Sequence, residues 1–151
     1  MPIQARFAHV NLIARDWKRL AEFYQQVLGC QPAPPERDLS GEWLEAATGV
    51  PGAHVRGMHL RLPGHGDRGP TLEVFEYDQR LEGLAPAANR PGFAHVAFAV
   101  SDVRAALEAV IAAGGGALGE RVSVNIPGAG ALSFVYATDP EGNVVELQQW
   151  G

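Results

Sequence analysis

The sequence predicts an α+β fold made of two βαβββ modules in tandem, and three observations support this prediction. The tetrapeptide Phe-Ala-His-Val occurs at residues 7–10 and again at residues 93–96, 86 residues later. A predicted strand, helix N-cap, helix and helix stop recur around both copies at that same spacing. After each predicted helix, apolar and polar residues alternate with the period of further strands.

Each module is predicted to begin with a strand and a helix. Residues 6–13 and 93–100 alternate as strands do. Asp16 and Asp102 follow at the positions where the helix N-caps are expected, since a short carboxylate can accept hydrogen bonds from the first free backbone amides. Apolar residues at helical spacing then continue to Gly29 and Gly115, which are predicted to end the two helices.

The rest of each half is predicted to be mainly strands. Residues 54–62 and 70–77 form two of them in the first half, and residues 131–137 and 144–150 form two in the second, separated by a turn at 139–143. Weaker strands are expected near Gln31 and Arg121, and a short helix at 41–47. These elements place module 1 at about 1–78, a linker at about 79–91 and module 2 at about 92–151.

The closing strands of the two halves align at a different spacing from the opening strands. Glu73 on the last strand of module 1 matches Glu146 on the last strand of module 2, 73 residues later. The first half is therefore longer by 13 residues in its middle. We expect the extra length between Pro32 and Gly52.

Composition restricts the location and the partners of the protein. The chain has 151 residues, a net charge of −5, a single lysine and no cluster of basic residues, so a nucleic-acid partner is not expected. No apolar run is long enough to span a bilayer, and no secretory signal is evident. Cys30 is the only cysteine, which excludes an internal disulfide and favours the cytoplasm.

Four residues at equivalent places predict a metal centre. Each half has a histidine on its first strand and a glutamate on its last, and two modules related by a two-fold axis could bring these side chains to one point. Two imidazoles and two carboxylates suit a divalent ion such as Mn²⁺, Fe²⁺, Co²⁺, Ni²⁺ or Zn²⁺. The predicted ligands are His9, Glu73, His95 and Glu146.

Strand alternation also predicts which side chains line a substrate pocket next to the metal. Residues on the ligand-bearing faces are small, aromatic or amide-bearing, whereas the opposite faces are aliphatic and suit a covering helix. The candidate pocket residues are Asn11, Phe75, Tyr77, Gln148 and Trp150. Residues 125–130 are expected to form either a mobile loop over this pocket or an ordinary hairpin turn.

Some polar residues have no counterpart in the other half. His54, His59 and His65 are expected to be surface or loop residues. Arg15, Arg56 and Arg90 could hold a substrate carboxylate or phosphate, although solvated arginines are the simpler expectation.

The chain resembles the vicinal oxygen chelate superfamily, which includes glyoxalases, epimerases, extradiol dioxygenases and antibiotic-resistance proteins. The resemblance rests on the two histidine strands, the helix with Phe23 and Tyr24 that ends at Leu28-Gly29, the strand around Glu73, and the turn at 139–143 before Glu146. It implies paired βαβββ modules whose sheets curve around a metal site, often in a homodimer. Whether the two halves meet within one chain or across a dimer stays open.

The occupancy of the four ligand positions favours some activities of this superfamily over others. Four protein ligands are similar to those of glyoxalase I and the epimerases. The resemblance therefore implies a metal-dependent isomerase, epimerase or lyase that acts on a small α-hydroxycarbonyl or acyl-thioester substrate. The alternatives are a non-catalytic small-molecule-binding or antibiotic-resistance protein, and an extradiol-type dioxygenase that would use His9, His95 and Glu146.

The expected reaction is a proton transfer next to a chelated carbonyl. The ion would bind two neighbouring substrate oxygens and stabilise the developing enediolate. Glu146 or Glu73 would move the proton as a general base. The resemblance alone favours Glu146 for this role.

Overall fold

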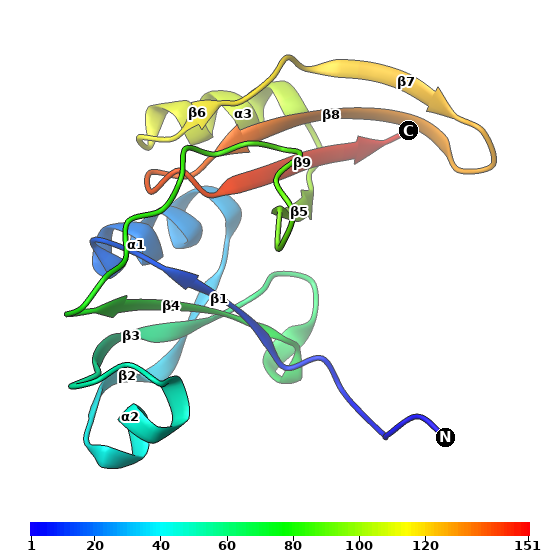
Figure 1. Ribbon diagram of the computed structural model, residues 1–151. Helices are drawn as coiled ribbons and strands as arrows, with labels where there is room; N and C mark the ends of the chain where they lie inside the picture. Colours follow the sequence, from blue (N-terminus) through cyan, green and yellow to red (C-terminus); the bar gives the residue numbers. More distant parts are fainter. The chain divides into compact units, whose positions relative to one another are not determined.

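The computed structural model describes residues 1–151, and the chain divides into two compact units, Met1–Glu82 and Gly83–Gly151. Each unit contains one module (Figure 1). The predicted α+β class is confirmed, with two separate mixed sheets and few helices. None of the helices has the length and apolar character needed to cross a membrane. Residues 78–94, which include the expected linker, contain no helix or strand.

Module 1 is a four-stranded sheet with the order β1-β4-β3-β2. Strand β1 runs parallel to β4, and the other neighbours are antiparallel. This order places β4, which carries Glu73, between β1 and β3. The elements are β1 (His9–Ile13), α1 (Trp17–Leu28), β2 (Gln31–Ser40), α2 (Glu42–Thr48), β3 (His54–Arg61), the 3-10 turn η1 (Gly66–Arg68) and β4 (Thr71–Tyr77).

Helix α1 covers the aliphatic face of this sheet. The Asp16 side chain accepts a hydrogen bond from the Arg19 amide at 3.1 Å, and Gly29 ends the helix in the left-handed conformation at φ 72°, so both predicted helix ends are confirmed. The helix packs against β3 and β4. Its apolar stripe is buried together with the inward side chains of those strands, and the most completely buried members are Leu20, Tyr24, Leu60, Leu72 and Val74.

Module 2 repeats this plan with a divided edge strand. Its sheet has the order β5-β9-β8-β6, and β7 also pairs with β8. Gly116 of β6 lies opposite Thr138, and β7 continues along the same side of β8. Together β6 and β7 therefore take the place of β2. The elements are β5 (His95–Ala99), α3 (Val103–Ala112), β6 (Gly116–Ala117), β7 (Val122–Ile126), β8 (Gly130–Thr138) and β9 (Val144–Trp150).

The end of α3 differs from the prediction. Asp102 caps the helix as expected, accepting from the Ala105 amide at 3.1 Å. However, Ala113 is the C-cap, and Gly114 rather than Gly115 takes the left-handed conformation at φ 95°. Gly115 is needed for a different reason. A Cβ atom at Gly115 would lie 2.3 Å from the Thr138 carbonyl oxygen, so only glycine lets the chain pass this close to β8.

Strand register confirms the alignment of the two modules. His9 lies opposite Thr71, two residues before Glu73, and His95 lies opposite Val144, two residues before Glu146. The two histidine strands therefore start at equivalent positions along their glutamate strands. Both start later than predicted, at the histidine itself, because the partner strands begin only at Thr71 and Val144.

The register also shows where the 13 extra residues of module 1 lie. His59 and Tyr136 are equivalent, since each is the cross-strand neighbour of its module's glutamate. His59 follows Gly29 by 30 residues, whereas Tyr136 follows Gly115 by only 21. Nine extra residues therefore precede β3, as expected, and the remaining four lengthen the β3–β4 connection. The expectation that all of the extra length precedes Gly52 is wrong.

The segment at 125–130 is a hairpin turn. Ile126 of β7 lies opposite Gly130 of β8, and the Ala129 amide donates to the Ile126 carbonyl at 3.0 Å. Of the two alternatives left open by the sequence, the structure therefore has the ordinary hairpin.

Candidate metal centre

In module 1, three neighbouring strands bring polar side chains to one face of the sheet. Glu73 on β4 lies opposite Asn11 of β1 on one side and His59 of β3 on the other. Because side chains alternate along a strand, His9 shares this face with Asn11. Leu72 and Val74 point to the opposite face and are fully buried. The face that carries Glu73 is therefore the one that α1 leaves uncovered.

The Glu73 carboxylate has three polar neighbours. Oε1 accepts a hydrogen bond from Asn11 Nδ2 at 2.8 Å and lies 3.6 Å from His9 Nε2. Oε2 lies 2.8 Å from His59 Nε2. The carboxylate is only 14% exposed and the His59 side chain 19%, whereas His9 is 42% exposed. One ligating atom from each of His9, His59 and Glu73 lies within 4.8 Å of the others.

His59 is therefore not the surface or loop residue that the sequence suggested. Its Nδ1 atom lies 2.7 Å from Thr71 Oγ1, and its ring makes edge-to-face contacts with His9 and Phe75. Burial lowers the pKa of His59, and the charges of Arg37 and His9 act in the same direction, while Glu73 opposes them. The predicted strands at 54–62 and 70–77 contained the signal for this placement, because antiparallel pairing of consecutive strands can bring a residue of the first strand beside Glu73.

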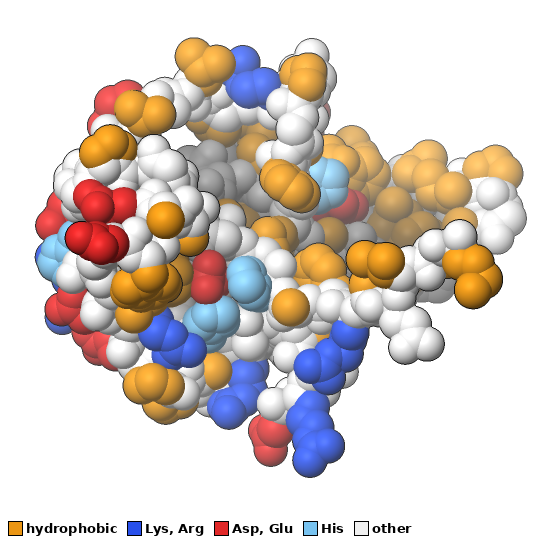
Figure 2. All heavy atoms as spheres, turned by 60° about the horizontal axis from the view of Figure 1, so that its bottom comes forward, with side chains coloured by type: hydrophobic (Ala, Val, Ile, Leu, Met, Phe, Trp, Pro, Cys, Tyr) orange, Lys and Arg blue, Asp and Glu red, His pale blue; other side chains and the backbone are white.

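Module 2 has a simpler arrangement on the equivalent face. His95 Nε2 lies 3.1 Å from Glu146 Oε2, with the carboxylate 13% exposed. Tyr136 lies opposite Glu146, and its ring centroid is 5.1 Å from that of His95. The sequence predicted that one histidine and one glutamate from each module meet at a single centre, and the structure brings the histidine and the glutamate together within each module. Figure 2 shows histidine side chains beside acidic side chains at the molecular surface.

Each histidine–glutamate pair has the spacing needed to share a divalent cation. Donors bound to one ion at 2.0–2.2 Å lie roughly 3–3.5 Å apart in tetrahedral or octahedral geometry. The His9–Glu73 separation of 3.6 Å and the His95–Glu146 separation of 3.1 Å are close to this range. Imidazole nitrogen and carboxylate oxygen are ligands that divalent transition metals accept. The residues present therefore fit such an ion.

The predicted pocket residues have different surroundings. Asn11 holds Glu73, as described above. Phe75 and Tyr77 share the Glu73 face but pack against a small core beside α2 that contains Leu44, Ala53 and Val55. In module 2, Trp150 Nε1 donates to Gln148 Oε1 at 2.5 Å, and Trp150 is 47% exposed. The pocket itself stays a prediction.

Two surface depressions within the modules lie away from the histidine–glutamate pairs. One of about 340 Å³ lies between β7, β8 and the C-terminus, and includes Ser123 and Gln149. Another of about 370 Å³ lies between the start of β2 and the β3–β4 connection, and includes Gln31 and Arg61. Neither contains a predicted ligand, so the metal chemistry does not assign a role to these depressions.

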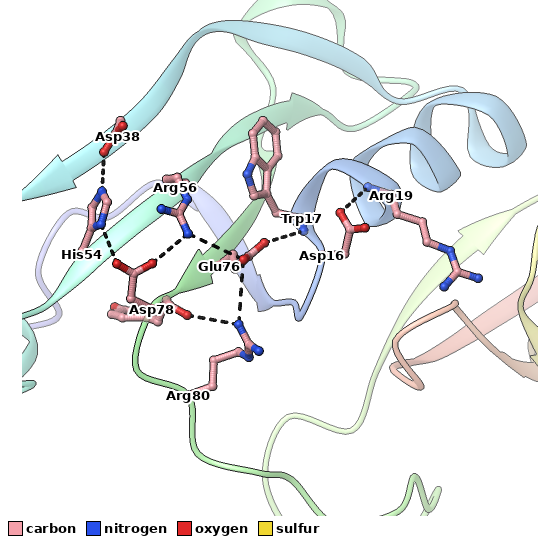
Figure 3. Close-up of polar contacts among 10 residues, drawn as sticks. Asp16, Trp17, Arg19, Asp38, His54, Arg56, Glu76, Asp78 and Arg80 are labelled. Carbon is pink, nitrogen blue, oxygen red and sulfur yellow. Dashed lines mark hydrogen bonds and ion pairs between the residues drawn. The ribbon is translucent and has the colours of Figure 1, made fainter.

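The unmatched arginines and His54 make intramolecular contacts. His54 lies 2.5 Å from Asp38 and 2.7 Å from Asp78, and Arg56 contacts Asp78 at 2.7 Å (Figure 3). These hydrogen bonds raise the pKa of His54 and lower the pKa of Asp78. Arg15 pairs with Glu82 at 2.5 Å, and Arg90 donates to the Ala85 carbonyl.

The same network fixes the start of α1. Glu76 accepts from the Trp17 amide at 3.2 Å and lies near Arg56 and Arg80 (Figure 3). A carboxylate at a helix N-terminus satisfies a free amide and is attracted by the helix dipole. These charged residues therefore connect β3, β4 and α1, on the side of the sheet opposite to Glu73.

Comparison with known proteins decides the family. Residues 6–147 match the Glyoxalase/Bleomycin resistance protein/Dioxygenase superfamily. The chain belongs to this superfamily. Over 147 residues, this chain is 26% identical to a Vibrio parahaemolyticus protein named probable lactoylglutathione lyase. The match covers 95% of this chain and 90% of that protein.

Solved structures of the superfamily share the fold. A glyoxalase family protein from Bacillus cereus is similar with a TM-score of 0.83 and 19% identity, over 99% of this chain and 96% of that one. The fosfomycin resistance protein of Listeria monocytogenes, solved with Mn(II) and sulfate, is similar with a TM-score of 0.56 and 14% identity, over 99% and 95%. At these identities the likeness shows the tandem βαβββ fold alone.

Proposed function

We propose that the protein is a divalent-metal-dependent lyase or isomerase that acts on a small α-hydroxycarbonyl or acyl-thioester substrate. The observation that carries the proposal is the pairing of a strand histidine with a glutamate in both modules, His9 with Glu73 and His95 with Glu146. In this proposal the four side chains are the protein ligands of the ion. The relative named probable lactoylglutathione lyase supports the reaction class.

The chemistry needs a Lewis acid and a base. When bound, a divalent ion would polarise neighbouring oxygens of the substrate and make the adjacent C–H group more acidic. A glutamate of the chain then removes the proton and returns it to the same or the neighbouring carbon. Return to the same carbon from the other face gives epimerisation, and return to the neighbour gives isomerisation.

Glu146 is the better candidate for the base. Glu73 is held by hydrogen bonds or close contacts from Asn11, His9 and His59, which restrict its movement. Glu146 contacts only His95 among polar side chains. A carboxylate with one partner can leave that partner more easily and reach a substrate proton. We therefore assign the proton transfer to Glu146 and a fixed ligand role to Glu73.

Metal content and proton exchange together test the proposal. Protein purified without chelators should contain a divalent ion, and His9→Ala should lose it. In D₂O, the metal-loaded protein should exchange the carbon-bound proton of a substrate, which NMR detects across a panel of α-hydroxycarbonyls and thiohemiacetals. Glu146→Gln should keep the metal and lose exchange.

Three results would contradict parts of this proposal. Protein that stays metal-free after incubation with Co²⁺, Ni²⁺, Mn²⁺, Fe²⁺ or Zn²⁺ would favour a non-catalytic binding protein. Full exchange by a metal-loaded Glu146→Gln variant would move the base to another residue. Oxygen consumption with a catechol in the presence of Fe²⁺ or Mn²⁺ would indicate a dioxygenase instead.

A further inference from the structure

We infer that His59 is a third metal ligand of module 1, so that His9, His59 and Glu73 together supply three donors to a divalent transition-metal ion. The inference deepens the proposed function and rests on it for the class of ion. It adds a residue that the duplicated histidine–glutamate pattern does not contain, because the equivalent residue of module 2 is Tyr136.

The first argument is the convergence of three donors. His9, Glu73 and His59 come from β1, β4 and β3, which are adjacent strands of one sheet. Their ligating atoms lie within 4.8 Å of one another, and the two histidine rings meet edge to face with centroids 5.4 Å apart. Since the sheet fixes all three backbones, only small side-chain movements separate this arrangement from a common coordination sphere.

The second argument is that the donors already have the outer partners that metal ligands need. A histidine that binds a metal through one nitrogen usually gives its other N–H to an acceptor, which fixes the ring orientation and the tautomer. His59 has this arrangement, because Nδ1 lies 2.7 Å from Thr71 Oγ1 while Nε2 is turned towards Glu73. Asn11 likewise holds the carboxylate of Glu73 at 2.8 Å.

The third argument is the contrast with module 2, which has the same strand register. The positions of Asn11, His59 and Thr71 are taken there by Ala97, Tyr136 and Val144. Module 2 therefore keeps its histidine–glutamate pair but has neither an imidazole at the third position nor these polar supports. If His59, Asn11 and Thr71 served only the stability of the sheet, module 2 would need equivalents, yet it forms the same sheet without them.

The donor set indicates the kind of ion. Two imidazole nitrogens and one carboxylate suit Zn²⁺, Co²⁺, Ni²⁺, Fe²⁺ or Mn²⁺ better than Ca²⁺ or Mg²⁺, which prefer sites made of oxygen alone. Three protein ligands also leave coordination positions for other groups. The exposed side of His9 gives access to these positions from solvent.

Cobalt binding to full-length variants tests the inference. We would titrate Co²⁺ into the wild type and into the double variant His95→Ala/Glu146→Gln, and follow visible absorption and bound metal per chain. Because the three donors of module 1 remain, the double variant should still bind one Co²⁺ per chain, more weakly than the wild type. Adding His59→Gln to the double variant should weaken Co²⁺ binding by about 100-fold or more. Changing a residue that only supports a ligand typically costs about 10- to 100-fold, so a loss of this size indicates that a ligand itself is gone. Tyr136→Phe, at the equivalent place in module 2, is the matched control and should leave binding unchanged.

A ligand count separates coordination by His59 from a hydrogen bond to Glu73. In Co²⁺-loaded wild-type protein, each coordinating imidazole gives a hyperfine-shifted ring N–H signal in the proton NMR spectrum. His59→Gln should remove one such signal, and His65→Gln, in an exposed loop, should remove none. An unchanged set of signals in His59→Gln would overturn the inference.

The outcomes distinguish failure of the inference from failure of the proposed function. Wild-type protein that binds Co²⁺, together with a folded double variant that does not, would overturn the three-donor set of module 1 but leave the metal-dependent function standing. Wild-type protein that binds no divalent ion would overturn both. Circular dichroism checks that each variant is folded, and the NMR count in His59→Gln decides the question if the double variant is not.

Discussion

His59 and Tyr136 occupy the same position in the two modules, each directly across from the glutamate of its module. Nε2 of His59 lies 2.8 Å from the Glu73 carboxylate. The ring of Tyr136 instead contacts the ring of His95 in a tilted arrangement. The two modules thus share one histidine–glutamate pair each and differ in the residue that the neighbouring strand places across from the glutamate. Module 1 carries polar support around its carboxylate, and module 2 carries an aromatic ring. The two glutamates are therefore suited to different tasks.

The outer partners of Glu73 and His59 give the first prediction. Asn11→Ala and Thr71→Val copy the residues of module 2, Ala97 and Val144, and so remove the supports without introducing foreign side chains. Each should weaken divalent-metal binding by about 10- to 100-fold, because unsupported ligands are less well oriented. Isothermal titration with Zn²⁺ or Co²⁺ measures the change. Ser133→Ala, on β8 of module 2, is the control, and equal losses in control and test variants would contradict the supporting role.

Much of the fold could be predicted because duplication makes each weak signal appear twice. The paired tetrapeptides, the two aspartate caps and the two closing glutamates all lie at equivalent positions in the structure. The edge strand β2 was harder to predict because Pro32, Pro34 and Pro35 interrupt its pattern. An edge strand tolerates proline since one side needs no hydrogen-bonded partner, and the pairing of β2 with β3 shifts between Ala33 and Arg37.

In the candidate site, sequence comparison could select only the residues that occur in both modules. His9, Glu73, His95 and Glu146 could be proposed as ligands because each has a counterpart, whereas His59 was not selected because its counterpart is a tyrosine. Comparison of the two halves identifies residues that occur in both modules and misses residues that occur in only one. The residue that pairs across from Glu73 depends on the length of the β3–β4 connection, which is four residues longer than the corresponding turn in module 2. Sequence alternation does not determine that pairing by itself.

Gly57 gives a second prediction, because β3 passes very close to β4 at this position. A Cβ atom at Gly57 would lie 2.1 Å from the Val74 carbonyl oxygen and 2.9 Å from the Phe75 Cα atom, and backbone cannot move aside easily. Gly57→Ala should therefore lower the free energy of unfolding by about 2 kcal/mol or more. Urea denaturation measures the loss. Gly83→Ala, where a Cβ atom would meet nothing within 4 Å, should change stability little, and equal effects would contradict the argument.

The two aspartate caps give a third prediction. Asp16 and Asp102 each accept a hydrogen bond at 3.1 Å from the amide three residues later. Asp16→Ala or Asp102→Ala should each cost about 1 kcal/mol of unfolding free energy, which corresponds to roughly 2–4 °C in Tm for a chain of this size. Asp102→Asn keeps an acceptor and should retain most of the stability. A loss in the asparagine variant as large as in the alanine variant would show that charge, not capping, is responsible.

The single cysteine gives a fourth prediction. Cys30 is 1% exposed, and burial raises its pKa to about 11, so the native thiol is neither accessible nor ionised at pH 8. A chromogenic disulfide reagent should react very slowly with native protein and with one thiol per chain in denaturant. Ser101→Cys, at an exposed position, should add one thiol that reacts at once. Rapid reaction of native Cys30 would show that module 1 opens around the end of α1 more readily than its packing indicates.

The last prediction concerns the pH dependence of the His54 network. Hydrogen bonds to Asp38 and Asp78 raise the pKa of His54 above its ordinary value near 6.5. The protonated imidazole therefore stabilises the folded state below about pH 6.5, and this contribution disappears as the pH rises through the raised pKa. The lowered pKa of Asp78 has the opposite effect, since its contribution is present above about pH 4 and is lost as the pH falls.

The two contributions overlap in mildly acid solution, so the effect of removing His54 should be greatest there. The Tm difference between wild type and His54→Gln should be larger at pH 5.5 than at pH 8.5, as measured by thermal denaturation in buffers of equal ionic strength. Arg56 stays charged at both pH values and holds Asp78 in either protein, so it does not produce the difference. His65→Gln removes an exposed loop histidine without an ion pair and should show no such trend. A wild-type advantage over His54→Gln that is constant with pH would mean that packing of the ring, not its charge, stabilises this corner of module 1.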